Sequence, residues 1–205
     1  MPLLIDADKR NASVAEFDGV TRDDGIQDLI RGAAGRIFPP LLPLKKGLMM
    51  DQPEFRYLCS YRAAFTEPQQ QIGTAHFGRR MIAALTGGEV EGERLRGRVM
   101  PSGGDWATID DKDTLRLDAR ITFETHDGAL IYISYRGVLR PLSVAHRHAR
   151  NGGPQTAAER KEIYFRTTPM FETGDERYAW LNDIVAVGLG ASVGGAVRYD
   201  VFELL

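Results

Sequence analysis

The sequence contains a single cysteine, Cys59, among its 205 residues. One thiol cannot form a disulfide within the chain, and it excludes zinc sites built from several cysteines. Cys59 lies in an apolar-rich segment, which predicts a buried structural thiol. No apolar run is long enough to cross a bilayer, and the apolar residues at 1–5 are too few for the core of a signal peptide. We therefore expect a cytoplasmic protein.

An excess of charge of either sign is also missing. The 26 Lys and Arg residues face 28 Asp and Glu residues, for a net charge of −2. This balance gives no general attraction to nucleic acid or to an anionic membrane, so neither is expected as a partner. The GK[ST] and HExxH motifs are absent from the sequence, and no GxSxG nucleophile elbow is predicted, which gives no support to a phosphate-binding loop, a zinc protease or a serine hydrolase.

Metal ligands at a recognisable spacing are lacking as well. His146 and His148 would share one face of an extended segment, but no further ligands accompany them. The sequence therefore predicts a surface loop there and no metal site, and no cofactor is expected.

The clearest pattern that is present is a strict alternation of side chains over residues 115–125, which a second segment at 130–136 follows. Such alternation predicts a strand with one packed face and one polar face. The apolar set is Leu115, Leu117, Ala119, Ile121 and Phe123, and the polar set is Arg116, Asp118, Arg120, Thr122 and Glu124. With the turn residues between them, the two segments form a β-hairpin.

The turn of this hairpin fixes its register. A two-residue turn at Asp127-Gly128 would pair Phe123 with Tyr132 and mix the two faces. A three-residue loop at 126–128 pairs Phe123 with Ile131 and keeps each face uniform, so this register is predicted. Such a loop ends in a residue with positive φ, which Gly128 adopts at little steric cost. On the polar face the pairs are then Thr122 with Tyr132, Arg120 with Ser134, and Asp118 with Arg136.

From residue 55 onward the chain is predicted to be almost wholly β, with strands at 55–66, 79–90, 93–101, 105–110, 114–125, 129–139, 162–172, 182–190 and 195–204. So many short strands favour a closed barrel or a sandwich. Residues 141–160 are predicted to form a long polar loop or lid, and 176–181 one helical turn that carries Trp180. Residues 1–54 form a separate arm in this prediction, with a short helix at 26–36 and a proline-rich connector, and 55–205 form one domain.

Two sets of residues are candidates for chemistry. Turn glycines at 103 and 104 could aim Asp105 and Trp106 into a cavity, where an indole stacks on a flat ligand and a carboxylate acts as a base; plain turns are the simpler interpretation. The polar face of the hairpin is either solvated surface, which periodicity alone favours, or the lining of a lumen. In a lumen, Arg120 would hold a carboxylate or enolate oxygen, and Tyr132 would donate a proton or a hydrogen bond.

The residues from 55 to the C-terminus resemble the DUF3237 family of small β-barrel proteins, also called UPF0311. The matching stretches include Leu85-Thr86-Gly87-Gly88-Glu89-Val90-Glu91-Gly92, Gly103-Gly104-Asp105-Trp106, Leu117-Asp118-Ala119-Arg120, Tyr164-Phe165-Arg166-Thr167-Thr168-Pro169 and Tyr178-Ala179-Trp180-Leu181-Asn182. The resemblance implies a closed, lipocalin-like or streptavidin-like barrel and self-association into a homo-oligomer. It implies no single activity, but several polar and aromatic residues of its motifs favour a site in the lumen.

Three functions follow from these observations as hypotheses. The first is a cofactor-free lyase, isomerase or hydratase that abstracts a proton from a small oxygenated substrate, with Asp105 or Glu91 as base, Arg120 as oxyanion partner and Tyr132 as proton donor. Its predicted substrate-binding residues are Trp106, Asp118, Tyr164, Arg166 and Trp180. The second is a non-catalytic binder or carrier of a small hydrophobic or aromatic ligand, which would be favoured if Asp118 and Arg120 face solvent. The third is a structural subunit whose barrel edge mediates assembly.

Overall fold

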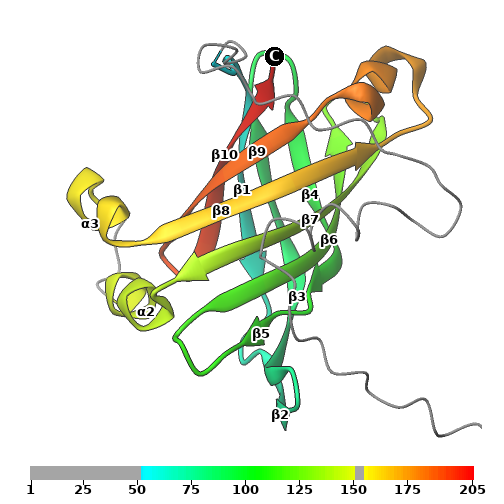
Figure 1. The fold of residues 1–205 in the computed structure, drawn as a ribbon. Coiled ribbons are helices and arrows are strands. Elements are labelled where there is room, and N and C mark those ends of the chain that lie inside the picture. Colours follow the sequence, from blue (N-terminus) through cyan, green and yellow to red (C-terminus); the bar gives the residue numbers. More distant parts are fainter. Residues whose placement is uncertain (1–51, 151–154) are drawn as a thin grey trace, which may run out of the picture. The chain divides into compact units, whose positions relative to one another are not determined.

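The fold is a closed antiparallel β-barrel of eight strands (Figure 1). The structure, a computed structural model, describes residues 52–150 and 155–205. Its strands are β1 (Phe55–Phe65), β2 (Gln70–Ala75), β3 (Gly78–Glu91), β4 (Gly97–Asp105), β5 (Thr108–Ile109), β6 (Leu115–Thr125), β7 (Leu130–Arg140), β8 (Tyr164–Glu172), β9 (Ala186–Val193) and β10 (Ala196–Leu204). Neighbours pair in the order β1-β10-β9-β8-β7-β6-β4-β3, and β1 also pairs with β3. This last pairing closes the barrel, which is one of the two architectures that the strand spacing favoured and the one that the family resemblance implied.

The hairpin of β6 and β7 has the predicted register. Phe123 pairs with Ile131, and Ile121 pairs with Ile133. Gly128 in the connecting loop has a φ of 87°. The apolar parity of β6 is buried and the polar parity points away from the core. The register is therefore confirmed, and its polar face is the outer face of the barrel.

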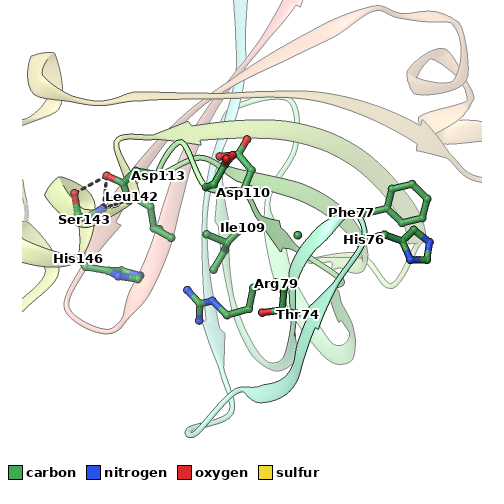
Figure 2. A pocket seen from close by; sticks show the side chains of 12 residues that line it. Thr74, His76, Phe77, Arg79, Ile109, Asp110, Asp113, Leu142, Ser143 and His146 are labelled. Carbon is green, nitrogen blue, oxygen red and sulfur yellow. Dashed lines mark hydrogen bonds between the residues drawn. The ribbon is translucent and has the colours of Figure 1, made fainter.

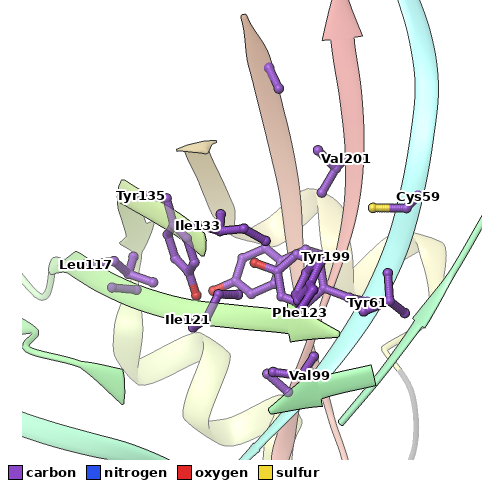
Figure 3. Close-up of a cluster of buried hydrophobic side chains, with 14 of the residues drawn as sticks. Cys59, Tyr61, Val99, Leu117, Ile121, Phe123, Ile133, Tyr135, Tyr199 and Val201 are labelled. Atoms are coloured by element: carbon purple, nitrogen blue, oxygen red, sulfur yellow. The ribbon is translucent and has the colours of Figure 1, made fainter. Parts of the chain in front are cut away.

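Side chains fill the interior of the barrel, and several of them are aromatic (Figure 3). The rings of Tyr61 and Tyr199 stack with centroids 4.9 Å apart, and Phe165 meets Tyr199 edge-on at 5.2 Å. Glycines on neighbouring strands leave room for these rings, since a Cβ at Gly190 would lie 2.5 Å from the Phe165 ring. Burial of this aromatic and aliphatic surface drives folding, and edge-on or stacked rings add to it.

Two helical regions flank β8 along the chain. Before it come α2 (Leu142–Arg150) and α3 (Ala157–Glu162), and after it comes the 3-10 helix η1 (Glu176–Asp183). The helical turn predicted around Trp180 is confirmed by η1. The polar loop predicted for 141–160 is wrong over α2 and α3, because Leu142, Ala145 and His148 line one buried side of α2. The many polar residues between them hide this spacing in the sequence.

His148 shows why the surface-loop prediction fails. Its imidazole is buried, with Nδ1 3.0 Å from Oε1 of Glu159 and Nε2 3.2 Å from Oε2 of Glu162. Both ring nitrogens thus face carboxylates of α3, so the histidine links the two helices. Within 52–150 and 155–205, no three potential ligand side chains are grouped to hold a metal ion.

β2 was not predicted, because all of its residues are exposed and it carries no apolar alternation. The chain divides into the units Met1–Asp51 and Gln52–Leu205, and the helix predicted at 26–36 lies outside the described residues. No helix in the described part of the chain is long and apolar enough to span a membrane.

Candidate ligand-binding site

The polar residues of the hairpin lie outside the lumen. The side chain of Arg120 is 46% exposed and that of Asp118 is 37% exposed. Tyr132, on the neighbouring strand, is also on the outer face and is 36% exposed. The prediction that these three side chains point into the barrel is wrong. An eight-stranded barrel has an interior just wide enough for side chains, and here the apolar parity occupies it.

A groove does exist on the outer face of the sheet, and four of the predicted substrate-binding residues line it. We call it the outer-face groove. It runs over β5, β6, β7, β8 and β9, and its lining includes Arg80, Trp106, Arg116, Asp118, Arg136, Tyr164, Arg166, Thr168, Val187 and Leu189. Trp106, Asp118, Tyr164 and Arg166 are thus brought together as predicted, but on the outside of the barrel.

Strand pairing explains how residues far apart in the sequence meet here. Arg116 lies opposite Val138, which lies opposite Arg166, which in turn lies opposite Leu189. All four point away from the core, because side chains directly across an antiparallel pair share a face. The neighbouring row runs from Asp118 through Arg136 to Thr168. The groove is therefore built on packed strands, which hold its side chains at fixed positions.

The groove is strongly cationic, although the chain as a whole is not. Four guanidinium groups line it, from Arg80, Arg116, Arg136 and Arg166, against the one carboxylate of Asp118. That carboxylate is held by Arg120, whose Nη1 lies 3.1 Å from Oδ1. Asp118 and Arg136 face each other across the strands as predicted. However, the ion pair of Asp118 is with Arg120 on its own strand.

Arg136 and Arg166 are the guanidinium groups best placed to receive a ligand. Among the described residues, neither forms an ion pair with a carboxylate at 4.0 Å or closer. Arg116 reaches Asp110 only at 3.6 Å and is 61% exposed. Guanidinium groups without a nearby carboxylate bind carboxylates and phosphates through paired N–H donors.

Aromatic rings stand beside these cations. The Tyr164 ring has Arg140 5.4 Å and Arg166 5.2 Å from its centroid, and Arg120 lies 5.5 Å from the Trp106 ring. Arg80 donates a hydrogen bond to the backbone oxygen of Trp106. These contacts hold the guanidinium groups in place, and both rings offer flat surfaces at the groove.

Asp105 is the one predicted catalytic residue that does point into the barrel. It is 6% exposed, and burial raises the pKa of its carboxyl group to about 6. Its Oδ1 accepts a 2.9 Å hydrogen bond from the backbone N–H of Asp118. The buried phenols of Tyr135 and Tyr199 have raised pKa values because of their burial and, in part, because of the charge of Asp105.

The other two predicted residues lie away from the groove. Glu91 is the exposed last residue of β3, and its backbone oxygen accepts a hydrogen bond from the Tyr57 hydroxyl at 3.3 Å. Trp180 lies on η1, and the guanidinium of Arg94 sits 4.1 Å from its ring centroid. Neither side chain lines the groove with the others.

A second pocket lies between the β2–β3 hairpin, the loop after β5 and the start of α2 (Figure 2). Two of its polar side chains have hydrogen-bond partners that bear on its role. Asp113 accepts hydrogen bonds from the N–H and the hydroxyl of Ser143, and Arg79 donates to Gln71. Burial and the nearby Arg150 lower the pKa of His146. Asp113 thus ties this pocket to the start of α2, and the charged lining of three carboxylates and one guanidinium differs in sign from that of the outer-face groove.

The family model described as "Protein of unknown function (DUF3237)" matches residues 53–204. The chain belongs to the DUF3237 family. A UPF0311 protein of Rhodopseudomonas palustris is 39% identical over 136 residues, which cover 66% of this chain and 84% of that protein. A UPF0311 protein of Bradyrhizobium diazoefficiens is 37% identical over 134 residues, covering 65% of this chain and 85% of the relative.

Solved structures resemble this DUF3237 protein over its barrel. The crystal structure of a conserved protein of unknown function from Rhodopseudomonas palustris has a TM-score of 0.67 at 34% identity, covering 76% of this chain and 100% of that one. A β-barrel-like protein from Acinetobacter baumannii has a TM-score of 0.65 at 33% identity, covering 77% of this chain and 99% of that one. An enzyme from Penicillium herquei, at 20% identity and a TM-score of 0.57 over 78% of this chain and 99% of that one, shares the fold.

Sequence reasoning missed several residues that give this DUF3237 protein its groove, namely Arg80, Arg116, Arg136, Val187 and Leu189. Their common signal is that they point outward from strands. In a single strand that signal is the same as for ordinary surface residues. The pairings of β3 with β5, β5 with β6, β6 with β7, β7 with β8 and β8 with β9 together show that they converge.

Proposed function

We propose that this DUF3237 protein binds a small organic anion in the outer-face groove. The observation that carries this proposal is the pair of guanidinium groups, Arg136 and Arg166, which line the groove and form no ion pair with a carboxylate among the described residues. Arg166 also lies beside the Tyr164 ring. A carboxylate or a similar anion would complete their hydrogen bonds. The exposure of Asp118 and Arg120 further supports a binder over an enzyme that works in the lumen.

The test is calorimetric titration of the full chain with hexanoate and with benzoate. Arg136→Met should weaken binding at least about tenfold, because a charged hydrogen bond to the ligand is lost. Arg98→Met is the matched control. Arg98 also faces outward from a strand, but it pairs with Glu124 and lies outside the groove. Absence of binding by the wild-type protein, or equal loss in both variants, would refute the proposal.

One observation favours a second candidate, the proton-transfer enzyme predicted from the sequence. Asp105 has a pKa of about 6, and near neutral pH such a carboxyl group is a suitable proton donor or acceptor. Because side chains fill the interior around Asp105, this candidate requires the barrel to open and admit the substrate. Asp105 then takes a proton from a carbon next to a carbonyl group, and phenols of the interior replace Tyr132 as hydrogen-bond donors. Tyr135 and Tyr199 are the choices, since the charge of Asp105 raises the pKa of both phenols.

Deuterium exchange tests this candidate without knowledge of the natural substrate. The full chain is incubated with 2-oxohexanoate in deuterated buffer, and loss of the proton signal beside the carbonyl is followed by NMR. An enzyme should speed the exchange above the buffer rate, and Asp105→Asn should abolish the gain. Exchange at the buffer rate, or an active Asp105→Asn variant, removes Asp105 from any such role.

A further inference from the structure

The outer-face groove has an apolar end as well as a cationic one. Val187 and Leu189, on β9, belong to the same groove as Arg136 and Arg166. Leu189 lies directly across from Arg166 and is 39% exposed. Phe55 at the start of β1 also lines this end and is 54% exposed. Apolar and cationic side chains therefore share one continuous hollow.

Apolar residues at these positions depart from the usual pattern of the sheet. In an antiparallel barrel the outward positions of a strand are ordinarily polar, as they are along β6. On β9 the outward positions are Val187 and Leu189, and the inward position between them is Gly188. An inorganic anion would need only the arginines. Exposed apolar side chains next to them indicate a ligand with an apolar part of its own.

We infer that the ligand is an amphipathic organic acid, with its anionic group at Arg136 and Arg166 and its apolar part across β9 beside Val187 and Leu189. The inference rests on the proposed function and adds the chemical class of the ligand. The geometry gives the required length. Arg136 is on β7, Arg166 is on the neighbouring strand β8, and Leu189, the partner of Arg166, is on β9. Two strand spacings amount to about 10 Å, which an extended aliphatic chain of medium length spans.

The experiment is a titration of the full chain with butanoate, hexanoate, octanoate and decanoate, each below its micellar concentration. Affinity should rise by up to about fourfold for each added methylene group, until the tail has crossed β9. Octanol and octylammonium, which have the same tail without the negative charge, should bind far more weakly. Equal binding of octanol and octanoate would overturn the inference.

Two matched variants locate the apolar end. Leu189→Ser should weaken octanoate binding by about tenfold and leave butanoate binding unchanged, because only the longer tail reaches β9. Met170→Ser is the control. Met170 also faces outward from the neighbouring strand β8, and it is more exposed than Leu189, but it does not line the groove. Equal effects of the two substitutions would overturn the inference.

The outcomes separate this inference from the proposed function. If all four acids bind equally and Arg136→Met abolishes binding, the anion site stands and the apolar end plays no part. If no acid binds, both fail. If the wild-type protein sediments as an oligomer and Leu189→Ser makes it monomeric, the apolar end is an interface between copies of the chain, and the inference is wrong.

Discussion

The backbone N–H of Asp118 donates a 2.9 Å hydrogen bond to Oδ1 of Asp105. Asp105 points into the core, whereas the side chain of Asp118 lines the groove on the opposite face of the sheet. The interior carboxyl group and the outer-face groove are thus separated by the thickness of one strand. A change in the charge of Asp105 therefore alters the strength of a hydrogen bond from the backbone of Asp118, a groove residue.

Asp105→Asn should stabilise the protein at pH 8. The native pKa of about 6 lies above the usual value of 3.8 for an aspartate, so the native state binds more protons than the unfolded state between these values. The free energy of unfolding of the wild type therefore falls as pH rises through this window, by about 3 kcal/mol for this group. Asparagine stays neutral and keeps an oxygen to accept the Asp118 N–H.

Urea unfolding of both proteins from pH 4 to pH 8 measures this effect. The variant should exceed the wild type in stability at pH 8, and the difference should shrink as pH falls below 6. A difference that does not change with pH would show that the Asp105 carboxyl group ionises in the native state much as it does in the unfolded chain.

Cys59 should resist thiol reagents in the native protein. Its side chain is fully buried, and burial together with the charge of Asp200 raises the pKa of the thiol to about 12. The thiolate is the reactive form, so its population at pH 8 is very small. Reaction with an aromatic disulfide should proceed only as fast as the barrel opens, and unfolding in urea should expose one thiol per chain. Immediate reaction under native conditions contradicts the buried position.

Gly190→Ala should destabilise the barrel by about 1–3 kcal/mol, because added volume in a packed core forces neighbours to shift. The new Cβ would lie 2.5 Å from the buried Phe165 ring. Gly174→Ala is the control, since a Cβ there meets nothing within 4 Å. Thermal unfolding of both variants checks the prediction. Similar melting temperatures for the two would mean that Phe165 has room to move.

Asp113→Ala should loosen the start of α2. The carboxylate of Asp113 accepts from the Ser143 N–H at 3.0 Å, and its backbone oxygen accepts from the Leu142 N–H at 2.8 Å. Loss of a side chain that caps a helix costs about 1 kcal/mol, and alanine is also strained at the φ of 58° found here. Asp111→Ala, an exposed residue of the same loop, should have little effect on thermal unfolding. Equal melting temperatures for Asp113→Ala and Asp111→Ala would contradict the role of Asp113 as a cap of α2.

The sequence predicts the parts of the fold that depend on local pattern. Alternation and a glycine turn suffice for the register of β6 and β7, because a one-residue slip would expose the whole apolar set. The same alternation misled the site prediction, because it separates two faces of a strand without showing which of them points into the barrel. The packing of the interior determines this. Tyr61, Tyr135 and Tyr199 fill the interior and leave the polar face outside.

The groove depends on long-range pairing, which local pattern does not contain. Arg166 and Leu189 become neighbours only because β8 pairs with β9, and η1 intervenes between them in the chain. The anchoring of α2 is similar, because Asp113 caps Ser143 from 30 residues away. These contacts depend on which strands pair in the folded protein. The local sequence pattern shows which residues are available, but it does not show that they become neighbours.

The ring of strands has one further consequence. Because β1 bonds to both β10 and β3, the ring of strands is closed at this point and neither strand presents a free edge there. A molecule that docks on the outer face of the barrel therefore contacts chiefly the side chains that point outward. A few substitutions on this outer surface can then change which ligand the protein binds, while the barrel itself keeps its fold.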